Sequence, residues 1–275
     1  MYKLTMADSK VITRAKQLLK DGKEEEARDL LLKAAYGPSL DTTAQAAFEE
    51  LFPVEGTLKK RLSGTVKGLQ AKDVATRRTA AKAIANEALE EGSRARAVWL
   101  KDPRTTHALT QALEDEDPQV VEQVITALSN IAELYLADFR AYPAVLRLLE
   151  SKRQVTRRYA VSAAWALAGF DASESVIPRF QDKVEAVRSA AVVGPAVLAS
   201  ERKVPAAAKK LLREPLVEAL KDESSTVRMR ASNSLRVLGD DSVIEALRAA
   251  AAVETSAVTR EVLENNIKVL GAKGV

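Results

Sequence analysis

The chain has 275 residues, of which 42 are Lys or Arg and 38 are Asp or Glu, so its formal net charge is +4. It contains no Cys and one His, His107, which excludes disulfides, zinc–thiolate sites, thiol nucleophiles and metal sites built on pairs of His. Its apolar residues are mostly Ala, Leu and Val, and aromatic residues make up only 4%. This composition favours helices over turn-rich β architectures. We therefore expect an all-α protein without a metal or cofactor.

No apolar run reaches the ~18–20 residues that span a bilayer, and the first residues, MYKLTMADSK, lack the apolar core of a signal peptide. The sequence also lacks GxGxxG and GxxxxGK[ST] loops and the HExxH and GxSxG motifs. We expect a cytoplasmic protein that does not enter the membrane and is not an enzyme.

Residues 1–54 are expected to form a helical cap. The stretch AKQLLKDGKEEEARDLLLKA places apolar residues on both sides of a turn at Asp21-Gly22, and it resembles half of a tetratricopeptide hairpin. A third helix is predicted at 43–52 and ends at Pro53. Because a terminal repeat must cover an apolar face that would otherwise meet water, we interpret this segment as the cap of a second domain, 55–275.

The second domain begins with a predicted helix at 57–69 and continues as pairs of helices. Residues 89–106, which follow the first pair, are an insertion that either carries function or reflects drift in repeat length. Turns such as DEDP and DESS separate the two helices of a pair, because Asp and Ser cap the following helix. The first helices of the later pairs are predicted at 107–115, 142–150, 175–182, 213–222 and 242–253.

Six segments of 13 residues supply the second helices and align without gaps. Their positions 1, 5, 9 and 12 are mostly apolar, which is the spacing of one stripe along an α-helix. Position 8 is small, so that a neighbouring helix can approach closely. The segments are TRRTAAKAIANEA (76–88), VVEQVITALSNIA (120–132), TRRYAVSAAWALA (156–168), VRSAAVVGPAVLA (187–199), VRMRASNSLRVLG (227–239) and VTREVLENNIKVL (258–270).

These pairs resemble HEAT repeats over about residues 55–270. The resemblance rests on a Pro in three of the first helices and on an Asp followed six residues later by Arg in two units. The residues concerned are Pro143, Pro178 and Pro215, Asp182 with Arg188, and Asp222 with Arg228. The resemblance implies a right-handed α-α superhelix of about six hairpins, in which the Asp–Arg pairs form a structural ladder between stacked turns.

Three units depart from this pattern. Val121 and Thr259 stand where the second and sixth units would carry the Arg, and Ser151 replaces the Asp of the third. The fifth unit, 213–239, matches best.

Second helices stacked in this way would present one continuous, concave face to a partner. Positions 3, 7 and 10 point away from the buried stripe and are mostly charged or polar. Trp165, at position 10, is the exception: beside Arg158 it resembles an interface hot spot, although it would equally fill a gap left by neighbouring Ala residues. The residues predicted to contact the partner are Arg78, Lys82, Arg158, Ser162, Trp165, Met229, Asn233 and Arg236.

We therefore predict a non-catalytic scaffold or adaptor that binds another protein along its second helices. The alternative is nucleic-acid binding, because residues 141–275 carry 21 basic and 16 acidic side chains. Such a protein would be similar to the alkylpurine DNA glycosylases built of HEAT-like repeats, with Trp99, Asp102 and Trp165 standing for that family's aromatic residues and Asp. Their spacing does not reproduce the family's motif. Similar repeats also occur in proteins that attach or remove bilins, but no residue here specifies a bilin.

Overall fold

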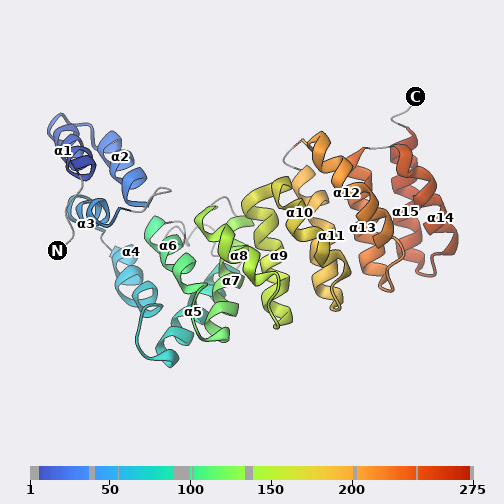
Figure 1. Cartoon of the computed structure of the whole chain (residues 1–275), viewed down its shortest axis with the longest axis horizontal. Helices are drawn as coiled ribbons and strands as arrows, with labels where there is room; N and C mark the ends of the chain where they lie inside the picture. The colour runs from blue at the N-terminus through green and yellow to red at the C-terminus, as the bar shows by residue number, and fades with distance from the viewer. Residues whose placement is uncertain are drawn as a thin grey trace. The chain divides into compact units, whose positions relative to one another are not determined.

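The computed structural model describes residues 6–36, 41–54, 56–89, 100, 102–133, 139–200, 203–239 and 241–272. Every regular element within these residues is helical, which confirms the predicted all-α architecture (Figure 1). The chain divides into two compact units, Met1–Val124 and Ile125–Val275, and each is described by itself.

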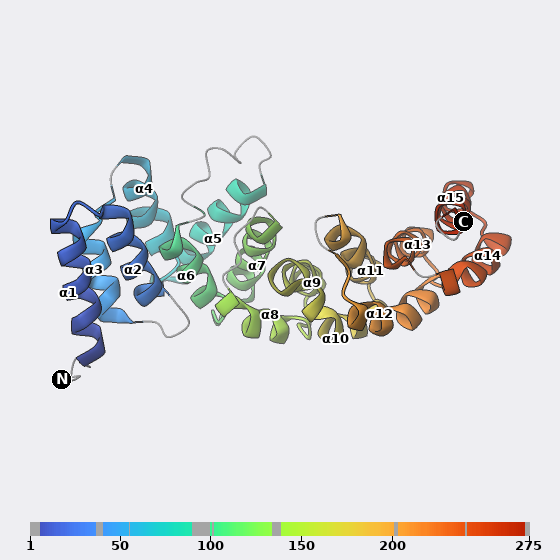
Figure 2. The ribbon, with the colours of Figure 1, turned by 90° about the horizontal axis from the view of Figure 1, so that it is seen from above.

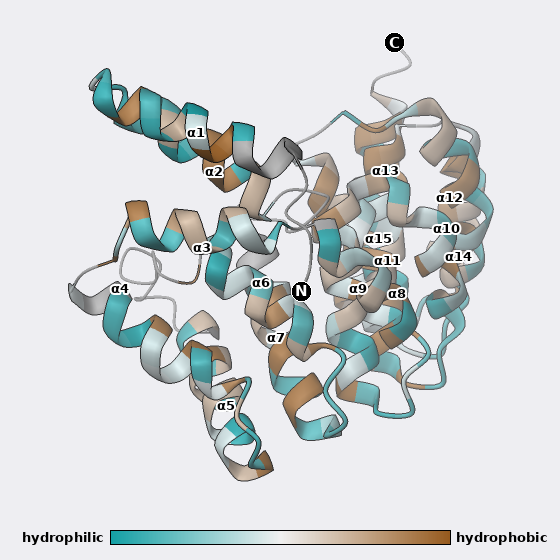
Figure 3. Ribbon diagram, turned by 60° about the vertical axis from the view of Figure 1, so that its left-hand side comes forward, coloured by the Kyte–Doolittle hydropathy of each residue, from teal (hydrophilic) through white to brown (hydrophobic). Residues whose placement is uncertain are grey.

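The N-terminal unit begins with three helices, α1 (Met6–Lys20), α2 (Glu24–Tyr36) and α3 (Thr42–Leu51). The chain turns between α1 and α2 at Gly22, whose φ of 73° is rare for a residue with a side chain. Ala and Leu side chains of all three helices close around Phe48 in one buried cluster. Figure 3 shows hydrophilic and hydrophobic residues mixed along these helices, as expected of amphipathic elements. The predicted hairpin and third helix are therefore present.

The same unit continues with α4 (Gly56–Arg61), the π-helical segment η1 (Leu62–Val66), α5 (Val74–Leu89), α6 (Pro103–Ala112) and the start of α7 (Pro118–Glu133). An Asp precedes α5, α6 and α7, and its carboxylate accepts N–H groups of the first helical turn. These caps are Asp73, Asp102 and Asp117. Of the predicted insertion, residues 90–99 and 101 lie outside the described residues.

Aromatic contacts join α2 and α3 to α6. The Tyr36 ring meets the edge of Phe48 at 6.1 Å between centroids and that of His107 at 5.9 Å. The Arg104 guanidinium lies 5.5 Å from the centroid of the Phe48 ring. The first three helices thus pack on the first helix of a repeat, which is where a cap belongs.

The C-terminal unit contains the end of α7 and then alternates first-helix segments with second helices. The first-helix segments are η4 (Phe139–Ala141) with α8 (Tyr142–Leu148), η5 (Gly169–Ala172) with α10 (Ser173–Val176) and η6 (Ile177–Gln181), α12 (Ala206–Ala219), and η7 (Asp241–Val243) with α14 (Ile244–Val253). The second helices are α9 (Gln154–Ala168), α11 (Glu185–Ala199), α13 (Ser225–Leu238) and α15 (Ala257–Gly271). Neighbouring second helices pack on each other, and Figure 2 shows them as one row beside the first-helix segments.

Three first helices differ from the prediction. The helix expected at 107–115 is α6, which begins at Pro103 within the predicted insertion and ends at Ala112. The segment expected at 175–182 is one turn of α-helix, α10, followed by the 3-10 segment η6, because Pro178 has no N–H with which to continue an α-helix. The helix expected at 213–222 begins earlier, at Ala206, and contains Pro215 in its interior.

The apolar stripe predicted for the second helices forms the core. In α13, Val227, Ala231, Leu235 and Leu238 are fully buried, and α12 packs on this helix. Position 8 faces the preceding second helix, as the Ser234 hydroxyl shows by donating to the Val192 carbonyl at 2.6 Å. The small residues at this position therefore allow close stacking.

The sixth segment is one residue out of register in the prediction. Val258 and Val269, predicted to be core, are 67% and 41% exposed, whereas Thr259 and Leu263 are buried. We therefore number the 13 positions of this segment from Thr259, which makes Arg260 position 2 and Asn266 position 8. The Asn266 side-chain N–H donates to the Ser232 hydroxyl at 2.8 Å.

Candidate partner-binding surface

The second helices are held in place by a ladder of arginines. The most buried pair joins Arg157 to Asp182, with Nε and a terminal nitrogen donating to the two carboxylate oxygens at 2.7 and 2.8 Å. Burial raises the pKa of Asp182, but the hydrogen bonds from Arg157 and the Val184 N–H, together with the charges of Arg157 and Arg179, leave that pKa below its ordinary value. The other terminal nitrogen of Arg157 donates to the carbonyls of Ser151 and Lys152 at 2.8 and 3.2 Å.

The same geometry recurs along the C-terminal unit. Arg188 donates to the backbone carbonyl of Asp182 at 2.9 Å and to the carboxylate of Asp222 at 2.7 and 3.0 Å. Arg228 donates to the carbonyl of Asp222 at 2.7 Å and to the carboxylate of Glu254 at 2.7 and 2.6 Å. The predicted ladder is present, but each carboxylate pairs with the arginine of the preceding repeat, and its own arginine binds only the backbone.

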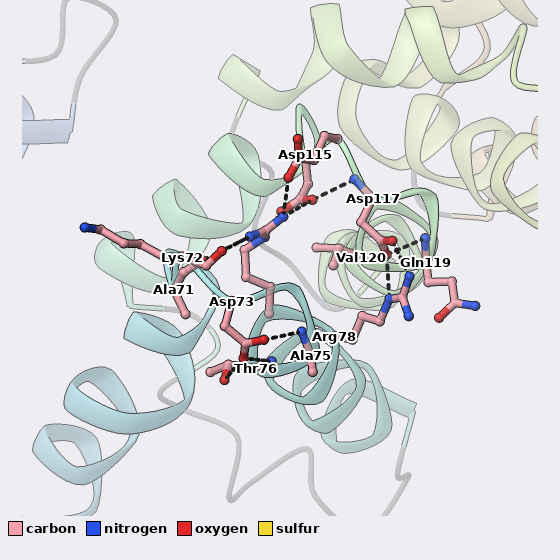
Figure 4. Close-up of polar contacts among 12 residues, drawn as sticks. Ala71, Lys72, Asp73, Ala75, Thr76, Arg78, Asp115, Asp117, Gln119 and Val120 are labelled. Atoms are coloured by element: carbon pink, nitrogen blue, oxygen red, sulfur yellow. Dashed lines mark hydrogen bonds and ion pairs between the residues drawn. The ribbon is translucent and has the colours of Figure 1, made fainter.

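Among the described residues of the N-terminal unit there is one ladder pair of this kind. Arg77 donates to Asp115 at 2.7 and 3.2 Å and to the carbonyls of Ala71 and Lys72 (Figure 4 shows this turn). The predicted partner-binding residue Arg78 lies beside it and donates to Asp117 at 3.0 and 2.5 Å. These bonds lower the pKa of Asp117 to about 2.

Sequence reasoning missed four members of the ladder: Arg77 with its acceptor Asp115, Arg157, and the acceptor Glu254. An Asp six residues before the Arg was the signal sought, yet the group that contacts the Arg there is a backbone carbonyl, which every residue has. An Arg at position 2 of the second helix would have been the better signal, because it finds both Arg77 and Arg157.

The prediction that Trp165 projects from the concave face toward a partner is wrong. Its side chain is buried, and its indole N–H donates to the Ala191 carbonyl at 3.1 Å. That carbonyl lacks an intrahelical partner because Pro195, four residues later, has no N–H. Gly194 leaves the space for the ring, since a Cβ there would lie 2.2 Å from the indole nitrogen. Trp165 therefore packs between α9 and α11 and joins them. Of the two interpretations given by the sequence, the one in which it fills a space in the packing is correct.

Position 10 belongs to the stacking contact in the first three segments. Ala85, Ser129 and Trp165 are all buried there. Positions 3 and 7 together with positions 4 and 11 form the outer side of α5, α9, α13 and α15, which we call the open face; on α11 only positions 7 and 11 reach it, because Ser189 and Ala190 are buried. On this face of α9, Arg158 is exposed and Ser162 is half-buried, and on α13 Met229 and Asn233 are half-buried.

The predicted contact residues do not form one described surface. Arg78 and the exposed Lys82 lie on α5 of the N-terminal unit, and the other six lie on α9 and α13 of the C-terminal unit. Asn233 also accepts a hydrogen bond from Asn266 at 3.0 Å, so it contributes to packing. Arg236, at position 10 of α13, is half-buried.

Several residues of the open face were missed because positions 4 and 11 were not considered. Val197 is 58% exposed on α11, and Arg230 and Val237 on α13 are half-buried. Val193, at position 7 of α11, is also half-buried and was not named. Helical periodicity places position 11 about 80° from position 3, on the same outer side, so the correct angular range would have found them.

The structure gives no support to the glycosylase-like set. Trp99 lies outside the described residues, and Trp165 is buried between helices. Asp102 caps α6 and accepts two hydrogen bonds of 2.7 Å from Arg104, so its carboxylate is committed to structure. His107 lies in a groove of about 670 Å³ that is lined mainly by α3, η1 and α6.

Other kinds of site are not found in the part of the chain that the structure describes. No three His, Asp or Glu side chains converge there as metal ligands would. No helix among these residues has the length and apolar character needed to cross a bilayer.

Comparisons with known proteins agree with this architecture. A family model described as HEAT repeats matches residues 62–165. No curated protein sequence matches the chain significantly. The archaeal HEAT-like repeats protein from Thermococcus onnurineus NA1 is 12% identical, with a TM-score of 0.58 over 99% of both chains. A designed armadillo repeat protein in complex with the peptide (KR)4 is 18% identical, with a TM-score of 0.62 over 76% of this chain and 99% of the designed one.

The likeness to solved structures concerns the fold, since the identities are low. Paired helices with small residues at position 8 and arginines joining successive turns give the same architecture from the sequence upward. The chain has the fold of a HEAT-like α-solenoid, and the HEAT-repeat model matches residues 62–165 of it.

Proposed function

We propose that the chain is a non-catalytic scaffold that binds a peptide segment of another protein along the open face of α9, α11, α13 and α15. The observation that carries this proposal is the direct packing of each of these helices on the next, which joins their open faces into one surface. Because the ladder and Trp165 fix the helices, little conformational entropy would be lost by the scaffold on binding.

Two further observations support the proposal. The residues that the fold requires, such as Asp182 in a turn and Arg157 at the start of α9, face the neighbouring turn, which leaves the exposed Arg158 available to a partner. The designed armadillo protein of similar architecture is in complex with a peptide, so such a stack of helices is compatible with peptide binding. The residues considered for catalysis support the non-catalytic part, because Asp102 and Trp165 are both engaged in structure.

Site-specific cross-linking tests this proposal. A photoreactive amino acid is placed at Ser162 or Asn233 on the open face, or, as the control, at exposed Glu218 on the first-helix side. In lysate of the source organism we expect both open-face positions to give adducts with the same protein and the control position to give none. The proposal would be refuted if the two open-face positions gave no adduct with a common protein, whether or not the Glu218 position gave one.

A further inference from the structure

The open face changes character along the chain. On α5 it carries Arg78, Thr79, Lys82 and Asn86, all polar and exposed. In the C-terminal unit, valines and arginines replace them.

Two arginines of the open face, Arg158 and Arg230, and Arg236, which borders that face at position 10 of α13, have no acidic neighbour among the described residues. No carboxylate within the described part of the chain lies within 4.0 Å of the guanidinium of Arg158, Arg230 or Arg236, although every ladder arginine has one or more. The acidic residues of α8 to α14 lie in the turns and first-helix segments, and α9, α11 and α13 have only Glu185, at the start of α11. Arg158 is held 5.3 Å from the centroid of the Tyr159 ring. The three cations are therefore available to an external anion.

Apolar side chains lie between these cations. Val193 and Val197 occupy positions 7 and 11 of α11, between Arg158 on α9 and Arg230 on α13. Val197 is 58% exposed, and Met229 and Val237 add half-buried apolar surface on α13. A ligand that covers all three helices must therefore satisfy separated positive charges and also bury valines.

We propose that the partner segment is an extended peptide that alternates acidic with apolar side chains and crosses α9, α11 and α13. This rests on the proposed function and adds the chemistry of its partner. Carboxylates would pair with Arg158, Arg230 and Arg236, and aliphatic side chains would cover Val193 and Val197. The phosphates of a nucleic-acid backbone would pair with the arginines but would leave Val193 and Val197 exposed to water. The surface ends at α15, where Glu261 is exposed on the open face and repels further carboxylates.

Selection from a random peptide library tests the composition directly. The full chain is immobilised and presented with displayed peptides of about 12 residues, long enough to cross three helices. We expect selected peptides to be enriched in Asp and Glu together with Val, Leu and Ile. Enrichment of Lys and Arg, or of apolar residues alone, would overturn the inference while leaving a peptide-binding scaffold in place. Selection of no peptide would remove both proposals.

Matched variants locate the binding site of a selected peptide. Arg158→Glu and Val197→Asp should each weaken binding roughly tenfold, and binding should weaken between ~50 and ~500 mM salt because the paired charges are screened. The controls are Arg248→Glu and Val253→Asp on α14, since both side chains are exposed on the first-helix side and should leave binding unchanged. Circular dichroism confirms that every variant is folded. Equal loss in variants and controls would place the peptide elsewhere and refute the inference.

Other occupants would be recognised in the same preparation. Binding of duplex DNA that is lost in Arg158→Glu would show that the cations serve phosphates, contrary to the inference. A dimer of the chain, detected by light scattering and disrupted by Val197→Asp, would show that a second copy covers the valines.

Discussion

Adjacent residues Arg157 and Arg158 have opposite roles. The guanidinium of Arg157 is buried and bonded to Asp182 and to two backbone carbonyls, whereas the side chain of Arg158 is exposed and stacks on Tyr159. One belongs to the fold and the other is available for binding. Position on the helix decides this, since position 2 faces the neighbouring turn and position 3 faces outward.

Replacing Arg157 should therefore cost far more stability than replacing Arg158. We expect Arg157→Met to lower the free energy of unfolding by about 3 kcal/mol, because the buried Asp182 carboxylate loses both hydrogen bonds from Arg157 and keeps only the Val184 N–H and the more distant Arg179. Arg158→Met should change it by no more than about 0.5 kcal/mol. Urea unfolding of both variants measures the difference. Similar losses for the two would mean that the buried pair is not stabilising.

The last carboxylate of the ladder predicts a dependence on pH. Hydrogen bonds from Arg228 lower the pKa of Glu254 from 4.5 to about 2 in the folded chain. Because the folded pKa is the lower one, the contribution of Glu254 to stability is complete above pH 4.5 and is lost as the pH falls toward 2. Comparing urea unfolding of the native chain and Glu254→Gln at pH ~6 and ~3 checks this. At pH ~6 the native chain should have a higher free energy of unfolding than Glu254→Gln, and this difference should be smaller at pH ~3. An unchanged difference would contradict the prediction.

At the scale of the element, α11 is shaped by its neighbour. Gly194 and Pro195 would weaken an isolated helix, yet together they make room for Trp165 and provide a free carbonyl for its N–H. The local cost in helix propensity is offset by the contact between α9 and α11. A Gly-Pro pair inside a second helix is therefore a sign of a large side chain on the preceding repeat.

Filling this space should be destabilising. In Gly194→Ala the added Cβ would meet the indole nitrogen, so we expect a loss of about 1–3 kcal/mol from overpacking. The control is Gly64→Ala, because nothing lies within 4 Å of a Cβ at that position, and the change there should be about 1 kcal/mol or less. Thermal unfolding compares the two. In a chain that already carries Trp165→Leu, the substitution Gly194→Ala should cost less stability than it does in the native chain. If the two losses in the free energy of unfolding simply add, the contact between these residues is refuted.

The last helix differs from the others on the side that would face a further repeat. Position 6 is fully buried in the preceding second helices but is Glu264, exposed, in α15. The exposed Lys268, at position 10, adds a second charge. Stacking another apolar helix there would desolvate both charges, so α15 has the polar outer face of a terminal repeat.

At the scale of the whole molecule, stability in a solenoid is a sum of contacts between neighbouring repeats. The division of the chain near Val124 falls in α7, whose position 2 is Val121 instead of a ladder arginine. The C-terminal unit has three successive Arg–carboxylate pairs of its own. Its stability should therefore be largely independent of the N-terminal unit.

A fragment that keeps α7 complete, residues 118–275, is expected to fold alone. It should show helical circular dichroism and one cooperative urea transition, because all contacts among α8 to α15 are retained. The complete chain provides the reference for its transition midpoint. A fragment without a cooperative transition would show that the first repeats are needed to fold the rest.

The helices, their pairing and, in every second helix but α15, the buried stripe follow from the amino-acid sequence, because an apolar period of 3.6 residues and small residues at position 8 are local properties. Which of the remaining helix sides packs on a neighbouring repeat and which is exposed depends on that repeat, so the apolar period of one helix does not predict it. For this reason the sequence pattern puts Trp165 on the exposed side, whereas it is buried. In α15, Val258, Val262 and Val269 form an apolar stripe as regular as the buried one beside it. Only packing against α13 and α14 decided between the two stripes, since burial requires a partner surface that the helix itself does not contain.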